Sequence, residues 1–268
     1  MKKSILIFCA VFTILSLTAF GLINRSLSTP DTIETFSGEE VATNTKAPEK
    51  INKRIFSDFI YDVGPRFNAI KKEDLDDLKS YSDLIGQEHM QRIVSYKSLS
   101  VKLLDGDRPA EIKEITDDGV FSAAQIDLLQ SANYSTNIAV RADYDEKWPE
   151  SGLVEASHWT PNLTVIPAKQ AEYVSGKDAL IIYLQEHSKD SRTGIQADKL
   201  QPAKLFFTVS KEGVVKNVRL DRTSNFHIVD ETMVTLISNA PGKWQPAENS
   251  KGEKVDQELV ISFGLMGC

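Results

Sequence analysis

The residues of this chain that are able to do chemistry are a run of carboxylates, four histidines and two cysteines. The carboxylates of Glu73-Asp-Leu-Asp-Asp77 are suited to general acid–base catalysis or to calcium binding. The run lacks the alternating oxygen ligands and the central glycine of a calcium-binding loop. A solvated helix start, stabilised by the helix macrodipole, explains these charges better. The remaining candidates show no metal-ligand spacing: Cys9, His89, His158, His187, His227 and Cys268.

The sequence contains none of the short motifs that bind nucleotide phosphates, activate a serine or hold a catalytic zinc. No nucleophile is paired with a base in any recognisable spacing. We therefore predict no catalytic, cofactor-binding or metal-binding residues, and we expect that the protein is not an enzyme.

The overall charge excludes two classes of partner. The net charge of the 268 residues is −7 at pH 7, the isoelectric point is about 5.3, and no run of five Lys or Arg residues occurs. Such a chain is not expected to bind nucleic acid, and it has no polybasic patch for an anionic membrane surface. Cys9 and Cys268 lie near opposite ends of the sequence, so we expect no intrachain disulfide.

The N-terminus carries an export signal. Lys2 and Lys3 precede the apolar segment 4–23, which at 1.5 Å per helical residue is about 30 Å long and can span a bilayer. Ala19 and Gly21 also fit a signal-cleavage site. We expect residues 1–24 to be either an inner-membrane anchor or a cleaved signal peptide, and both place the rest of the chain in the periplasm. Residues 25–54, rich in Ser, Thr, Pro, Glu and Lys, are predicted to be a disordered linker.

A smaller α+β domain of unknown role is predicted over residues 55–161. Its elements are an amphipathic helix, a strand, a short helix capped by Ser122 and a long two-stranded ribbon, expected over residues 72–85, 98–104, 122–130, 134–144 and 153–166. On the polar face of the ribbon, Arg141 and Asp143 are interpreted as solvated, with an ion pair as the alternative.

The C-terminal region 162–268 is predicted to be a second α+β module. A capping box at Ser175-Gly-Lys-Asp178 is expected to start its first helix. Two strands then flank a tight turn at Gly213, a helix carries an apolar stripe and ends at Pro241, and a last strand covers 256–264. The stripe consists of Val229, Met233, Leu236 and Ile237. We expect Trp244 to pack over the seam between helix and sheet.

Three motifs follow one another in this C-terminal region. They are Val165-Ile-Pro-Ala-Lys-Gln-Ala-Glu-Tyr173 with Gly176, the pattern F-x-V-x-x-x-G-x-V-x-N-V at 207–218, and Trp244-x-Pro-Ala247 with Gly252. In this order they resemble the C-terminal domain of TonB-family proteins. The resemblance implies an antiparallel sheet with two helices that binds peptide segments of outer-membrane transporters. It also implies an energy transducer for transmembrane transport, which works with a proton-driven motor complex in the inner membrane.

In that family the last strand is a sheet edge, and the partner segment adds to it as a further strand. A free edge exposes unpaired backbone N–H and C=O groups, so it accepts such a strand, and it also invites pairing between two copies of the chain. By position, the side chains of Gln257, Glu258 and Val260 would tune selectivity. The predicted partner-binding residues are Gln257, Glu258, Leu259, Val260, Ile261, Ser262 and Phe263.

Several features depart from the family pattern. The segment 4–23 contains no histidine, with which the family couples to the motor, and the linker 25–54 has few prolines. The domain predicted over 55–161 also separates linker and module. The sequence therefore supports two alternatives, a tethered transducer or accessory protein, and a periplasmic binding or scaffold protein without motor coupling.

Overall fold

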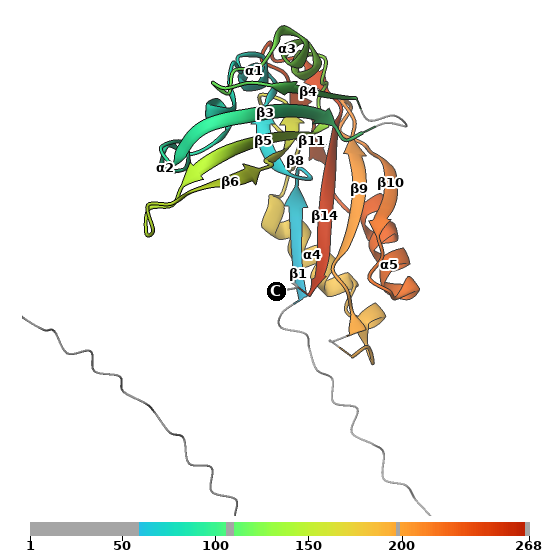
Figure 1. Cartoon of the computed structure of the whole chain (residues 1–268). Helices are drawn as coiled ribbons and strands as arrows, with labels where there is room; N and C mark the ends of the chain where they lie inside the picture. Colours follow the sequence, from blue (N-terminus) through green and yellow to red (C-terminus); the bar gives the residue numbers. More distant parts are fainter. Residues whose placement is uncertain (1–58, 106–109, 197–198, 266–268) are drawn as a thin grey trace, which may run out of the picture. The chain divides into compact units, whose positions relative to one another are not determined.

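The computed structural model of the chain describes residues 59–105, 110–196 and 199–265, all within one compact unit that spans residues 50–268. These residues form a mixed α+β fold, as the sequence predicts (Figure 1). The predicted export segment 1–24 and linker 25–54 lie outside the described residues. Within the described ranges, no helix is long and apolar enough to cross a bilayer.

A six-stranded mixed sheet is the first of two main sheets. One strand pair, β2 with β7, is parallel, and the other pairs are antiparallel. The strands are β2 (Asn68–Lys71), β7 (Asn162–Ile166), β5 (Asn137–Lys147), β3 (Ile93–Leu103), β4 (Glu111–Ile115) and β6 (Val154–Trp159), the last paired only with β5. The helical segments of this part are α1 (Lys72–Asp76), η1 (Tyr81–Leu84), α2 (Gln87–Met90) and α3 (Ala123–Gln130).

The local signals for α3 act as the sequence predicts. The Ser122 hydroxyl accepts a hydrogen bond from the Gln125 backbone N–H, and the Gln125 side chain accepts one from the Ser122 N–H, both at 3.2 Å. This capping box satisfies donors that the first helical turn leaves unpaired. The Gln125 amide also donates to the Leu99 carbonyl at 2.9 Å, so the cap fastens α3 to β3.

Ser122→Ala is expected to destabilise the protein by about 1 kcal/mol, because the helix start loses its side-chain acceptor. Urea unfolding measures the change, and Ser122→Asn, which restores a capping oxygen, should recover most of it. Equal losses for Ala and Asn would show that the cap does not stabilise α3.

The sequence predictions for the rest of this part are partly wrong. The helix predicted over 72–85 is divided into α1 and η1, because Ser80 begins a new capped turn. The strand predicted over 153–166 is two strands, β6 and β7, which pair with different parts of β5. The expected two-stranded ribbon is thus the centre of a larger sheet, whose core includes the fully buried Leu99, Ile138, Val140 and Val165.

The other main sheet is antiparallel and has four strands, in the order β1-β14-β9-β10. Its strands are β1 (Phe59–Gly64), β14 (Gln257–Leu265), β9 (Ala203–Val209) and β10 (Val215–Arg222). Its helices are α4 (Lys177–His187) and α5 (His227–Ser238), with the short helix η2 (Asp190–Arg192). Two short ribbons complete this part, β8 (Glu172–Tyr173) with β11 (Trp244–Gln245) and β12 (Ala247–Glu248) with β13 (Lys254–Val255).

The core of this part lies between the four-stranded sheet and the two helices α4 and α5. Val229, Met233 and Ile237 of the predicted stripe are fully buried there, as expected. Trp244 is 7% exposed, with its ring centroid 5.4 Å from that of Tyr173 and 5.3 Å from that of Phe207, so the predicted packing is confirmed. The capping box predicted at 175–178 does not form, because Gly176 is the N-cap with φ +90° and no side chain caps α4.

Two strands do not follow the domain boundary predicted at residue 161. β1 precedes every strand of the six-stranded sheet in the sequence, yet it belongs to the four-stranded sheet. β7 follows residue 161, yet it belongs to the six-stranded sheet. In addition, the Glu258 backbone N–H donates to the Ser135 hydroxyl at 2.8 Å. The chain therefore crosses between the two sheets more often than the predicted boundaries allow.

An ion pair forms between Arg141 and Asp143, where solvation was predicted. The Arg141 guanidinium lies 2.7 Å from the Asp143 carboxylate, which also accepts a hydrogen bond from Ser98 at 2.8 Å. Burial raises the pKa of Asp143, but the hydrogen bonds from Arg141 and Ser98 and the Arg141 charge outweigh it and lower this pKa to about 2. The carboxylate is therefore held in its charged form.

A pH dependence follows from this lowered pKa. Stability contributed by Asp143 is fully present above the ordinary value of 3.8 and is lost as the pH falls towards about 2. Asp143→Asn should therefore lower the free energy of unfolding near neutral pH and lose less of it between about pH 5 and about pH 2. Urea titrations at a series of pH values measure both, and parallel curves for the two proteins would contradict the assignment.

Candidate partner-binding site at β14

The predicted partner-binding residues all lie in β14, but this strand is not a sheet edge. β9 pairs with it on one side, from Gln257↔Val209 to Phe263↔Ala203. β1 pairs with it on the other side, from Val260↔Gly64 to Leu265↔Phe59. The expectation that Gln257–Phe263 offers a free edge is therefore wrong for the part from Val260 onwards. The reason is that an extended segment of the same chain already occupies the position.

The side chains of these residues divide between the two faces of the sheet. Leu259, Ile261 and Phe263 are buried in the core under the helices. Val260 is buried on the opposite face. Most of the side chains expected to contact a partner are therefore structural.

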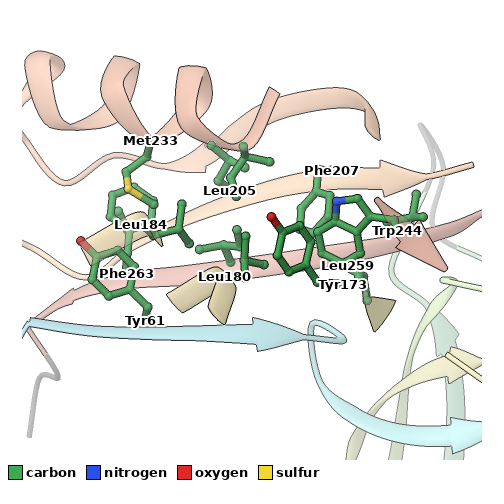
Figure 2. Close-up of a cluster of buried hydrophobic side chains, with 14 of the residues drawn as sticks. Tyr61, Tyr173, Leu180, Leu184, Leu205, Phe207, Met233, Trp244, Leu259 and Phe263 are labelled. Carbon is green, nitrogen blue, oxygen red and sulfur yellow. The ribbon is translucent and has the colours of Figure 1, made fainter. Parts of the chain in front are cut away.

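Two aromatic side chains anchor β1 in the position beside β14. Phe59 and Tyr61 are each 5% exposed and belong to the core of the four-stranded sheet. Figure 2 shows Tyr61 among the buried side chains of this core. The Tyr61 hydroxyl is hydrogen-bonded to the fully buried Ser188 hydroxyl at the end of α4. The Arg192 guanidinium lies over the Phe59 ring, 4.4 Å from its centroid. Burial raises the pKa of Tyr61, against the hydrogen bond with Ser188 and the Arg192 charge, so the hydroxyl stays protonated near neutral pH.

The solvent side of β1 carries a charged contact. The Lys177 ammonium at the start of α4 lies 2.6 Å from the Asp62 carboxylate. Both side chains are more than half exposed, so this pair contributes little to stability. It does set which charge is favourable at this position of the strand beside β14, because the ammonium attracts a carboxylate and repels another cation.

A cavity of about 550 Å³ opens where β1 leaves β14. β1 ends at Gly64, opposite Val260, and the chain turns away at Pro65 towards the six-stranded sheet. Leu259, which precedes Val260 in β14, has no pairing partner in β1 and lines the cavity. The other walls come from the end of β1 with Pro65, from the chain around β8, from the start of α4 and from β11.

The first two predicted residues are covered by other segments. The Gln257 side-chain oxygen accepts a hydrogen bond from the Ala171 backbone N–H at 2.7 Å. The Glu258 backbone N–H is taken by Ser135, and its carboxylate pairs with Arg219. On the β1 side, β14 is thus without a neighbouring strand only in the short stretch between Glu258 and Val260.

The other edge of the four-stranded sheet, β10, is poorly suited to strand addition. Its pairing with β9 shifts register twice, between Lys216 and Arg219 and between Leu220 and Arg222. Bulges and charged side chains are features by which edge strands avoid further pairing. The position beside β14 is therefore the one in this sheet that accepts a regular extended strand.

The described candidates for chemistry do not come together into a site, and Cys9 and Cys268 lie outside the described residues. Glu73 and Asp74 lie in the first turn of α1, as a solvated helix start predicts. Among the described residues, no group of three or more His, Cys, Asp or Glu side chains is placed to hold a metal ion. His89 has a structural contact instead, because its ring nitrogen lies 2.7 Å from the Tyr144 hydroxyl.

Comparison of the chain with known proteins gives a single result. No protein-family model, no curated protein and no solved structure matches it. Any function must therefore be argued from the motifs and from the geometry around β14.

Proposed function

We propose that this protein is a TonB-like periplasmic protein that binds extended segments of outer-membrane transporters by β-strand addition beside β14. Residues 4–23 would tether it to the inner membrane, where a proton-driven motor complex would be its second partner. In this role it would be an energy transducer, or an accessory to one, in transmembrane transport.

The observation that carries the proposal is the pairing of β1 with β14. A six-residue extended segment, contributed from far away in the sequence, lies in register beside β14 with alternate side chains in the core. The position thus has what strand addition requires, namely backbone partners along one side and pockets for every second side chain. The four-stranded sheet with α4 and α5, and the three sequence motifs, agree with this proposal.

A second candidate function is a periplasmic binding or scaffold protein with a TonB-like fold and no motor coupling. Two observations favour it. The segment 4–23 contains no histidine, and β14 is already paired on both sides over most of its length. A strand that is already paired on both sides offers few free backbone groups to a transporter segment.

Disulfide trapping tests strand addition directly. The probes are synthetic peptides from periplasmic segments of outer-membrane transporters of the same cell, each with one cysteine at successive positions. The full chain carries Ser262→Cys in β14, with Cys9 and Cys268 replaced by serine. We expect disulfides from alternate peptide positions only, as the period of an extended strand requires. Thr208→Cys in the central strand β9 is the matched control. Equal trapping at both sites, or none at Ser262→Cys, would overturn the proposal.

The N-terminus of the mature protein separates the two candidate functions. An intact N-terminus in the inner-membrane fraction is expected for a tethered transducer. A new N-terminus near residue 22 in the soluble fraction would remove the transducer role and leave the binding or scaffold protein.

A further inference from the structure

We infer that β1 is a replaceable occupant of the partner site, and that the segment which displaces it carries two aromatic residues at alternate positions and a carboxylate after the second. This inference rests on the proposed strand addition and specifies its partner. The chemistry of the displacing segment is deduced from what β1 itself places beside β14.

β1 and a partner strand cannot both occupy the position beside β14. β1 pairs with every residue of β14 from Val260 to Leu265. Since β9 takes the other side of the same residues as far as Phe263, no backbone remains for a third strand. A partner that adds beside β14 must therefore replace β1 and cannot lie next to both.

β1 is placed so that it can leave without dismantling the sheet. It is the outermost strand, paired with β14 alone among the described strands. Figure 1 shows it at the side of the sheet, next to the red strand β14. A departing β1 would lose its six pairings and would uncover the sites of Phe59 and Tyr61. β9, by contrast, is held between β14 and β10.

The vacated positions define the side chains that fit. Two aromatic rings are needed two residues apart, because Phe59 lies under the Arg192 guanidinium and Tyr61 bonds to Ser188. A carboxylate is favoured at the next position, because Lys177 contacts Asp62 there. The pattern aromatic-x-aromatic-Asp/Glu therefore describes the partner segment, running antiparallel to β14 as β1 does.

A separate segment has one contact that β1 cannot make. β1 turns away after Gly64 because the chain must reach β2, only a few residues later. A partner is free of this constraint and can continue straight past Leu259 into the space of the cavity of about 550 Å³, which the end of β1 and Pro65 only border. The hydrogen bond between Glu258 and Ser135 closes the edge beyond that point. This additional contact opposes the advantage that β1 has from its high effective concentration, on the order of mM for a short tether.

Competition between β1 and a partner strand has a quantitative consequence for partner affinity. The apparent dissociation constant of a partner equals its intrinsic value divided by the fraction of molecules in which β1 has left. A substitution that weakens β1 without touching β14 therefore tightens partner binding, and a bond that holds β1 in place abolishes it.

A reversible lock tests the exchange in the full chain. Asp62 and Ser262 face each other across the β1–β14 pair, so cysteines at both positions lie close enough for a disulfide. Cys9 and Cys268 are replaced by serine, and the probe is a fluorescent peptide with the sequence of residues 59–65. We expect binding to the reduced protein and at least a tenfold loss on oxidation. Equal binding to both forms would overturn the exchange.

A complementary variant tests the specificity of the vacated site. In Tyr61→Ala, β1 is weakened and the site of the tyrosine ring is empty, so the same peptide should bind at least tenfold more tightly than to the natural chain. A second peptide with alanine at the tyrosine position should gain by the same factor, but it should bind both proteins at least tenfold more weakly than the first peptide, because it leaves the site of the ring empty. If Tyr61→Ala does not fold, the disulfide between positions 62 and 262 still tests the exchange, because it leaves the core side chains unchanged.

The outcomes separate this inference from the proposed function. Transporter peptides that are trapped by Ser262→Cys, together with a β1 peptide that binds the oxidised lock as well as the reduced one, would retain strand addition and refute the exchange. Exchange of the β1 peptide without trapping of any transporter peptide would retain the exchange and refute the transporter partner.

Discussion

Replacing Tyr61 with alanine is expected to lower the free energy of unfolding by about 3–5 kcal/mol, the usual cost of removing a buried aromatic ring. The ring is 5% exposed, lies among side chains of α4 and β14, and its hydroxyl bonds to Ser188 (Figure 2). Truncation leaves a cavity and also leaves the fully buried Ser188 hydroxyl without its partner. Urea unfolding followed by circular dichroism measures the loss.

Two variants on the same strand are matched controls. Ile60→Ala changes a side chain that is 42% exposed, so its loss should stay below about 1 kcal/mol. Tyr61→Phe keeps the ring and removes only the hydroxyl, for which about 1–3 kcal/mol is expected because Ser188 becomes unsatisfied. Similar losses for Ile60→Ala and Tyr61→Ala would show that β1 is not anchored by its inward face.

Hydrogen exchange then distinguishes loosening of β1 from loosening of the whole core. If β1 opens as a separate unit, Tyr61→Ala should accelerate exchange in β1, while the amides of α5 and those that join β9 to β10 keep their protection. Uniform acceleration across the four-stranded sheet would mean that β1 unfolds only with the rest of the protein, which would count against its replacement by a partner.

The elements whose signals are local could be predicted from the sequence. The cap of α3 at Ser122, the turn at Gly213 between β9 and β10, and the apolar stripe of α5 all occur where expected. Each of these depends on residues within a few positions of one another. The buried position of Trp244 was also predicted, because a bulky aromatic between turn residues packs most readily over a seam.

The neighbour of β14 could not be predicted, because strand pairing over long distances leaves little local trace. β1 and the end of β14 are about 200 residues apart. Alternation in Phe59-Ile-Tyr-Asp-Val63 does indicate a strand with one apolar face. It does not say which sheet that face covers, and the predicted boundaries place these residues in the domain 55–161 with no strand assigned to them.

The capping box at Ser175 shows a different limit. The spacing of Ser175 and Asp178 satisfies the pattern, but a capping serine must itself stand at the N-cap. Here the helix begins one residue later, at Lys177, and Gly176 takes the N-cap with a positive φ. The position at which the helix starts is therefore set by the backbone and not by the motif alone. Gly176 permits a positive φ at the N-cap, so Ser175 stands outside the helix and cannot cap it.

Gly213→Ala is the other substitution with a large expected effect, because two costs coincide at this turn. Its φ of +76° lies in the left-handed region, where a Cβ atom costs about 1–2 kcal/mol. The added Cβ would also come closer than 3.0 Å to the backbone carbonyl oxygen of Trp244. Backbone cannot rotate away as a flexible side chain does, so β11 must shift and the packing of Trp244 on Phe207 is disturbed.

Gly252→Ala separates the two costs. Its φ of +77° is nearly the same, but nothing lies within 4 Å of the added Cβ. Gly252→Ala should therefore lose about 1–2 kcal/mol, and Gly213→Ala should lose clearly more in the same urea titration. Near-ultraviolet circular dichroism should change only for Gly213→Ala, because only that variant moves a buried tryptophan. Equal losses would mean that the turn relaxes away from Trp244, and that the close approach of β11 to the β9–β10 turn is not required for the fold.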